Sequence, residues 1–267
     1  RHYIFPRAER FSFEKSQTPP VPDLYRLRSC FCFHNNTAGK KTIVFLFKGG
    51  IFMNTHLKDP GSAITHLIAM GGAVICSFPL LFKAVQSDSH TAVFSMAVFI
   101  GSMILLYGAS SLYHSLDISA KVNLLFRRID HAMIFVLIAG SYTPVCLLAL
   151  PASTGIPLLI LVWSAAVIGI GLKIFIINCP HWVSSIIYIA MGWTCVLVFK
   201  PLVTALPAAA FGWLLAGGII YTIGGVLYGL KLPVFDKLPK SFGSHEIFHL
   251  FVMGGSFCHF IFMYVYM

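Results

Sequence analysis

The sequence predicts an all-α integral membrane protein, a bundle of seven transmembrane helices whose N-terminus lies in the cytoplasm. Of its 267 residues, 57% are hydrophobic and only 10% are charged, and the mean hydropathy is +0.82. Soluble domains carry about 25% charged residues, so the composition excludes that class. The seven cysteines are scattered and odd in number, and they therefore indicate neither a disulfide framework nor a zinc knuckle.

Residues 1–52 differ from everything that follows them. They are rich in Lys and Arg, and they contain no apolar stretch long enough to cross a bilayer. The Lys48-Gly-Gly sequence can be encoded by a purine-rich run shortly before the Met53 codon, as in a bacterial ribosome-binding site. We therefore expect Met53 to be the true start and residues 1–52 to be a non-native extension. A disordered basic arm is the alternative, and residues 53–267 form the membrane domain in either case.

Seven apolar windows follow Met53, and each is close to the roughly 20 residues that cross a bilayer. Pro144 lies inside the third window, where a kink is tolerated if neighbouring groups bond the freed carbonyl. Gly225 and Gly229 in the sixth window are spaced for close packing against another helix. The predicted spans are 62–84, 91–114, 131–150, 155–177, 184–206, 208–230 and 246–267.

Basic residues near the ends of these spans are unevenly divided between the two sides of the membrane. One side carries only Lys83 and Lys200. Because Lys and Arg favour the cytoplasmic side, the richer side is predicted to be cytoplasmic, together with the start of the first span. Charge at these positions orients the spans, so the net charge of +10 is no evidence for nucleic-acid binding. The richer side carries Lys58, Lys121, Arg127, Arg128, Lys173, Lys231, Lys237 and Lys240.

Ionisable residues gather at the cytoplasmic ends of three predicted helices. The second span ends at His114, and the third begins at Asp130. The seventh opens with His245 and His249, which share one helix face because they are four residues apart, as Ser110 does with His114. Three imidazoles at one depth suit a zinc ion with an open fourth position. Asp130 would then position or deprotonate a water molecule, and Ser110 would support a ligand or an oxyanion.

Each of these residues also has a purely structural interpretation. With so many histidines, a single His-x3-His pair is a weak signal. Asp130 could cap the third helix, His114 could be an interfacial residue, and Ser110 could be a packing serine. His66 and His259 fit hydrogen-bonded core histidines better than metal ligands. The coincidence of depth favours a metal site over these separate interpretations.

The same residues belong to longer motifs, namely Ser110-Ser-Leu-Tyr-His114, Ile129-Asp-His-Ala-Met-Ile-Phe135, Ala139-Gly-Ser-Tyr-Thr-Pro144, Gly224-Gly-Val-Leu-Tyr228 and His245-Glu-Ile-Phe-His249 with His259-Phe260. Together they resemble the hemolysin III family, the bacterial branch of the progestin and adipoQ receptor superfamily. The resemblance covers the chain from about Asp59 to Met267. It implies seven helices with the N-terminus inside and a zinc ion held by three histidines. The implied ligands are His114, His245 and His249, with Asp130 and Ser110 nearby.

The resemblance leaves three functional hypotheses. Related membrane hydrolases cleave amide bonds in lipids such as ceramides, which implies a zinc-dependent hydrolase of lipid amide or ester bonds. The bacterial branch is named for haemolytic activity and is often described as channel-forming, which implies a cytolytic membrane protein. Receptor relatives bind lipid-related or protein ligands, so a lipid sensor with structural zinc is the third. Membrane lipids are the expected partners, nucleic acid is not, and the cell membrane is the expected location.

Overall fold

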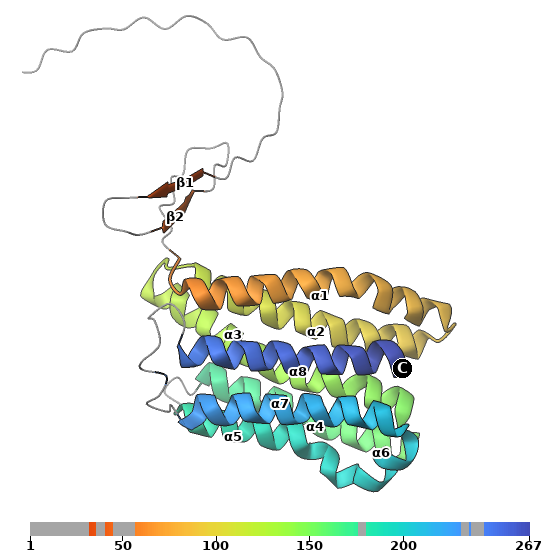
Figure 1. Ribbon diagram of the computed structural model, residues 1–267. Helices are drawn as coiled ribbons and strands as arrows, with labels where there is room; N and C mark the ends of the chain where they lie inside the picture. Colours follow the sequence, from red (N-terminus) through yellow and green to blue (C-terminus); the bar gives the residue numbers. More distant parts are fainter. Residues whose placement is uncertain (1–31, 36–40, 45–56, 176–179, 231–234, 236–242) are drawn as a thin grey trace, which may run out of the picture.

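The computed structural model describes residues 32–35, 41–44, 57–175, 180–230, 235 and 243–267. In these parts of the chain, seven helical segments are long and apolar enough to cross a membrane, and they lie side by side in one bundle (Figure 1). The predicted seven-span all-α architecture is therefore confirmed. Within the predicted N-terminal extension, β1 (Cys32–Asn35) pairs antiparallel with β2 (Lys41–Val44). The rest of residues 1–52 lies outside the described residues, so the proposed start at Met53 stays a prediction.

Consecutive spans run in opposite directions, which brings the starts of α1, α3, α5 and α8 to the same end of the bundle as the ends of α2, α4 and α7 (Figure 1). Two spans are composite, because η1 continues α3 and η2 joins α5 to α6. The helices are α1 (Pro60–Gln86), α2 (His90–Ser115), α3 (Ala120–Pro144), α4 (Ala152–Phe175), α5 (His181–Gly192), α6 (Phe199–Ala205), α7 (Ala208–Leu230) and α8 (Ser244–Tyr266), with a π-helical η1 (Val145–Ala149) and a 3-10 η2 (Trp193–Val198).

The third span begins well before the predicted residue 131. Helix α3 starts at Ala120, and the Ser119 hydroxyl caps it by accepting the N–H of Val122 at 3.4 Å. The predicted start lies too far along the chain because polar residues such as Arg128 lower the hydropathy of the first turns of α3. These residues are nevertheless good helix formers. Asp130 therefore lies about three turns inside α3, and its interpretation as a helix cap is wrong.

The two composite spans contain irregular turns that are bonded within the protein. Pro144 has no amide hydrogen, and the π-helical η1 follows it directly, so the span departs from α-helical geometry where the sequence allowed a kink. The 3-10 turn η2 was not predicted. There the Tyr142 hydroxyl donates to the Gly192 carbonyl at 2.6 Å and accepts the N–H of Cys195 at 2.9 Å. Backbone groups that leave the helical pattern at membrane depth need such partners.

Helices α5 and α7 pack closely at the predicted glycines. A Cβ atom added to Gly225 would lie 3.2 Å from Ile189, and one added to Gly229 would lie 3.1 Å from the Ser185 hydroxyl oxygen. The predicted close packing through Gly225 and Gly229 is therefore confirmed.

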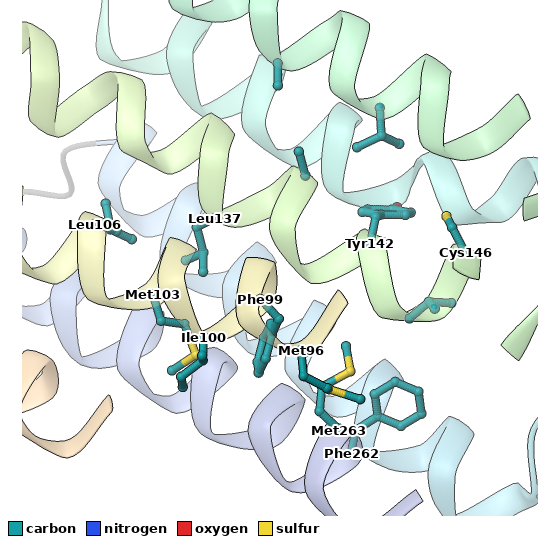
Figure 2. Packing of buried hydrophobic residues seen from close by; sticks show 14 of the residues in the cluster. Met96, Phe99, Ile100, Met103, Leu106, Leu137, Tyr142, Cys146, Phe262 and Met263 are labelled. Atoms are coloured by element: carbon teal, nitrogen blue, oxygen red, sulfur yellow. The ribbon is translucent and has the colours of Figure 1, made fainter. Parts of the chain in front are cut away.

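Helices α2, α3 and α8 contribute many of the buried residues of the apolar core (Figure 2). Phe99 of α2 and Phe262 of α8 are fully buried in it, whereas the outward faces of α1 and α4 expose large apolar side chains such as Phe78 and Ile168. An apolar outer face suits contact with lipid chains. The labelled core residues are Met96, Phe99, Ile100, Met103, Leu106, Leu137, Tyr142, Cys146, Phe262 and Met263.

Candidate metal centre

The three histidines predicted to bind a metal come together at one end of the bundle. His114 lies in the last turn of α2, and His245 and His249 lie in the first two turns of α8. One ring nitrogen from each can be chosen so that all three lie within 4.8 Å of one another. The Nε2 atoms of His114 and His245 are 3.0 Å apart. This cluster could hold a metal ion.

The start of α8 is fixed by the glutamate between the two histidines. Glu246 is buried, and its carboxylate accepts the N–H of Gly243 at 2.7 Å and the hydroxyl proton of Ser62 on α1. These bonds satisfy one of the free N–H groups at the helix start and tie α8 to α1. The rings of His245 and His249 are thereby held on one face, with their centroids 4.5 Å apart.

The start of α1 contacts two of the three imidazoles at their Nδ1 atoms. The Nδ1 atom of His114 lies 2.9 Å from the Asp59 carboxylate, and the Nδ1 atom of His249 lies 3.3 Å from the Thr65 hydroxyl. The bond to His114 lowers the pKa of the Asp59 carboxyl. Sequence reasoning missed both contacts. The Asp59-Pro60 pair is a helix-start pattern, which marks where α1 begins but does not identify these partners.

His66 extends the histidine cluster by one ring. It stacks on His249 with a centroid distance of 3.5 Å and an interplanar angle of 8°, and its other edge meets Tyr107. Neither ring nitrogen of His66 has a hydrogen-bond partner in the described part of the chain, so the expectation of a hydrogen-bonded core histidine is wrong for His66. It is confirmed for His259, whose Nε2 atom lies 3.3 Å from the Leu214 carbonyl oxygen.

Ser110 and Asp130 lie at the cavity that His245 and His249 also line. Both side chains are buried, with 1% and 5% of their surfaces exposed. Among the described residues the Ser110 hydroxyl makes no hydrogen bond of standard geometry, although it lies near enough to the Asp130 carboxyl to interact with it. The structure thus places Ser110 and Asp130 on the lining of the same cavity as His245 and His249, and their predicted roles stay predictions.

The cavity extends from the histidine cluster along the interior of the bundle. On α8 its lining runs from His245 to His259, a rise of about 21 Å at 1.5 Å per residue. The lining away from the cluster is mostly apolar and comes from the two composite spans and from α4, α7 and α8. Residues there include Val145, Leu158, Val198, Leu202, Phe211 and Val252.

The donor set of the cluster fits a zinc ion. Imidazole is a preferred zinc ligand, and catalytic zinc sites often use three protein ligands. Because the Asp59 carboxylate accepts the Nδ1–H of His114, the lone pair on the His114 Nε2 atom faces the Nε2 atom of His245. A neutral His245 can donate its Nε2–H to that lone pair, and a cation that replaced this proton would be bound by both nitrogens.

The family model described as haemolysin-III related matches residues 54–260. This chain belongs to the haemolysin-III related family. The matched range includes all five predicted site residues and Asp59. The family and the seven apolar helices together confirm the predicted multi-pass membrane protein.

Three relatives from different organisms are similar to this chain over about three quarters of its length. "Hemolysin-3" of Bacillus cereus is 39% identical over 202 residues, which are 74% of this chain and 87% of the relative. "Hemolysin-3 homolog" of Bacillus subtilis (strain 168) is 38% identical over 208 residues, 76% of this chain and 92% of the relative. "Adiponectin receptor protein" of Drosophila melanogaster is 26% identical over 230 residues, 76% of this chain and 49% of the relative.

Proposed function

We propose that this haemolysin-III-related protein is a zinc-dependent membrane hydrolase of lipid amide or ester bonds. The observation that carries the proposal is that Ser110, Asp130 and the two α8 histidines line the same long cavity. A polar cluster beside a mostly apolar chamber matches a substrate with a polar scissile bond and an apolar chain.

The cavity has the length that a lipid chain requires. Its lining extends about 21 Å along α8, whereas each leaflet supplies about half of the ~30 Å hydrocarbon core. An acyl chain that occupies the region around Leu202 and Phe211 would place its carbonyl group toward the histidine cluster. Binding the chain in this way would position the carbonyl beside Asp130 and Ser110.

The side chains at the cluster have the chemistry that hydrolysis needs. A zinc ion held by His114, His245 and His249 would polarise the scissile carbonyl and make water more acidic. Asp130 would accept a proton from the attacking water and pass it to the departing amine or alcohol. The Ser110 hydroxyl would donate a hydrogen bond to the oxygen that becomes negatively charged. The products would be a carboxylic acid and an amine or alcohol.

Cleavage by the purified chain tests this proposal. The protein would be placed in nanodiscs with N-acyl sphingolipids and ester phospholipids, and released fatty acid would be measured by mass spectrometry. We expect release that stops when zinc is removed by a chelator and returns when zinc is added. A zinc-loaded protein that releases no fatty acid from either lipid class would contradict a hydrolase and favour zinc bound for a structural role in a lipid sensor.

A cytolytic or channel-forming function is the second candidate, and the observation that favours it is the name "Hemolysin-3" of two relatives. Ion flux through liposomes separates the two functions. A pore conducts ions in vesicles made of non-cleavable ether lipids and continues to do so after chelation. A hydrolase permeabilises only those vesicles whose lipids it can cleave.

A further inference from the structure

Asp59 makes two bonds to the same histidine. Its backbone N–H donates to the His114 carbonyl at 2.9 Å, and its carboxylate accepts from the His114 Nδ1 atom at 2.9 Å. Asp59 occupies the N-cap position of α1, yet its side chain makes no capping bond there. An aspartate at this position normally accepts an N–H of the first helical turn. Here the carboxylate bonds to the His114 imidazole instead. Helix capping therefore does not explain the orientation of the Asp59 side chain.

The carboxylate determines which nitrogen of His114 can bind a metal. A carboxylate only accepts hydrogen bonds, so it requires the proton of a neutral imidazole to be on Nδ1. The lone pair is then on Nε2, the atom that lies 3.0 Å from His245. Metal-binding histidines commonly donate their second N–H to a carboxylate, which fixes the ring orientation and makes the ligand nitrogen more basic.

Thr65 of α1 makes a comparable contact with the Nδ1 atom of His249. The Thr65 hydroxyl lies 3.0 Å from the carbonyl oxygens of Gly61 and Ser62, to which it donates. Its oxygen is therefore free to accept the Nδ1–H of His249, 3.3 Å away. The start of α1 thus contacts the Nδ1 atoms of two of the three clustered rings.

We propose that Asp59 is a positioning residue for the metal centre, which holds the His114 ring with its Nε2 atom toward the bound ion, and that Thr65 does the same for His249. The inference rests on the metal site of the proposed function. It adds α1 to that site, although α1 contributes no ligand.

Zinc affinity of the full-length protein tests this inference. Zinc binding to the detergent-purified chain would be measured by competition with a chromogenic chelator. We expect Asp59→Asn to weaken zinc binding about 10- to 100-fold, the usual effect of losing such a partner. Asp59→Ser keeps a preferred helix cap but is too short to reach His114, so it should weaken binding similarly and serves as the second variant if Asp59→Asn does not fold. Asp59→Glu keeps a carboxylate and should bind more tightly than either.

The matched control is Asp117→Asn. Asp117 is exposed near the same end of α2 and bonds only to Asn123 among the described residues, at 2.6 Å. We expect the control to keep the parent affinity. The visible absorption spectrum of the cobalt-loaded protein is a second measurement, because it reports the geometry of the bound metal. If Asp59 served folding alone, this spectrum would not change. We expect the Asp59→Asn spectrum to differ from the parent spectrum.

The outcomes separate this inference from the proposed function. Zinc binding by the parent with an unchanged affinity and cobalt spectrum in both Asp59→Asn and Asp59→Ser would overturn the role of Asp59 and leave the metal site standing. A parent protein that binds no zinc would overturn the metal site itself, and the role of Asp59 with it.

Discussion

His114 of α2 and His245 of α8 direct their Nε2 atoms at each other across 3.0 Å, although 131 residues separate them in the chain. His249 completes the group from the next turn of α8. His114 and His249 are buried and His245 is half-buried, and imidazole nitrogens that converge in this way can bind a proton or a cation. This relationship underlies the proposed zinc site.

Replacement of Asp130 by Asn tests whether this carboxylate is the base. Asn cannot take up a proton, so we expect lipid cleavage to fall by about 10²- to 10⁴-fold, the contribution of general acid–base catalysis. Bound zinc should remain, because Asp130 is not among the three clustered ligands. Fatty acid release and zinc content would be measured on the same preparation. Full activity in the variant would exclude Asp130 as the base.

Replacement of Ser110 by Ala tests the expected oxyanion contact. Among the described residues the buried hydroxyl makes no hydrogen bond of standard geometry, so its removal should cost little stability. We expect kcat to fall by about 10²- to 10³-fold, as when one donor to an oxyanion is lost. Ser111→Ala is the control, because that hydroxyl instead donates to the Ala63 carbonyl at 3.2 Å. Equal activities of the two variants would argue against a catalytic Ser110.

Gly169 tests the packing of α3 against α4. A Cβ atom at this position would lie 2.3 Å from the ring of the buried Phe135. We expect Gly169→Ala to lower the free energy of unfolding by about 1–3 kcal/mol, the usual cost of overpacking. Gly171→Ala is the control, because nothing lies within 4 Å of its added Cβ atom. Thermal unfolding in detergent would compare them, and a Gly169→Ala protein as stable as Gly171→Ala would contradict the described α3–α4 contact.

Hydropathy was sufficient to predict the seven spans and which polar residues share an end of the bundle. Alternating span directions place His114 level with His245 and His249 whatever the details of packing. Hydropathy did not reveal the polar first turns of α3, because residues such as Arg128 form helix without being apolar.

The contacts of α1 with the histidine cluster could not be predicted from the sequence for a different reason. Whether Asp59 reaches His114, or His66 stacks on His249, depends on the rotation and approach of α1 against its neighbours. The periodicity of α1 does not specify these, since most of its surface is apolar and faces outward. The 3-10 turn η2 could not be predicted for the same reason, because its hydrogen bond to Tyr142 forms only when the helices have packed together.

Metal analysis of the purified full-length protein tests the central claim most directly. Zinc per chain would be measured by mass spectrometry for the parent and for a variant in which His114, His245 and His249 are all alanine. His90→Ala is the control, since His90 is exposed at the start of α2, the opposite end of that helix from His114. We predict one zinc ion per chain in the parent and the control and none in the triple variant. Equal zinc in the parent and the triple variant would contradict the account.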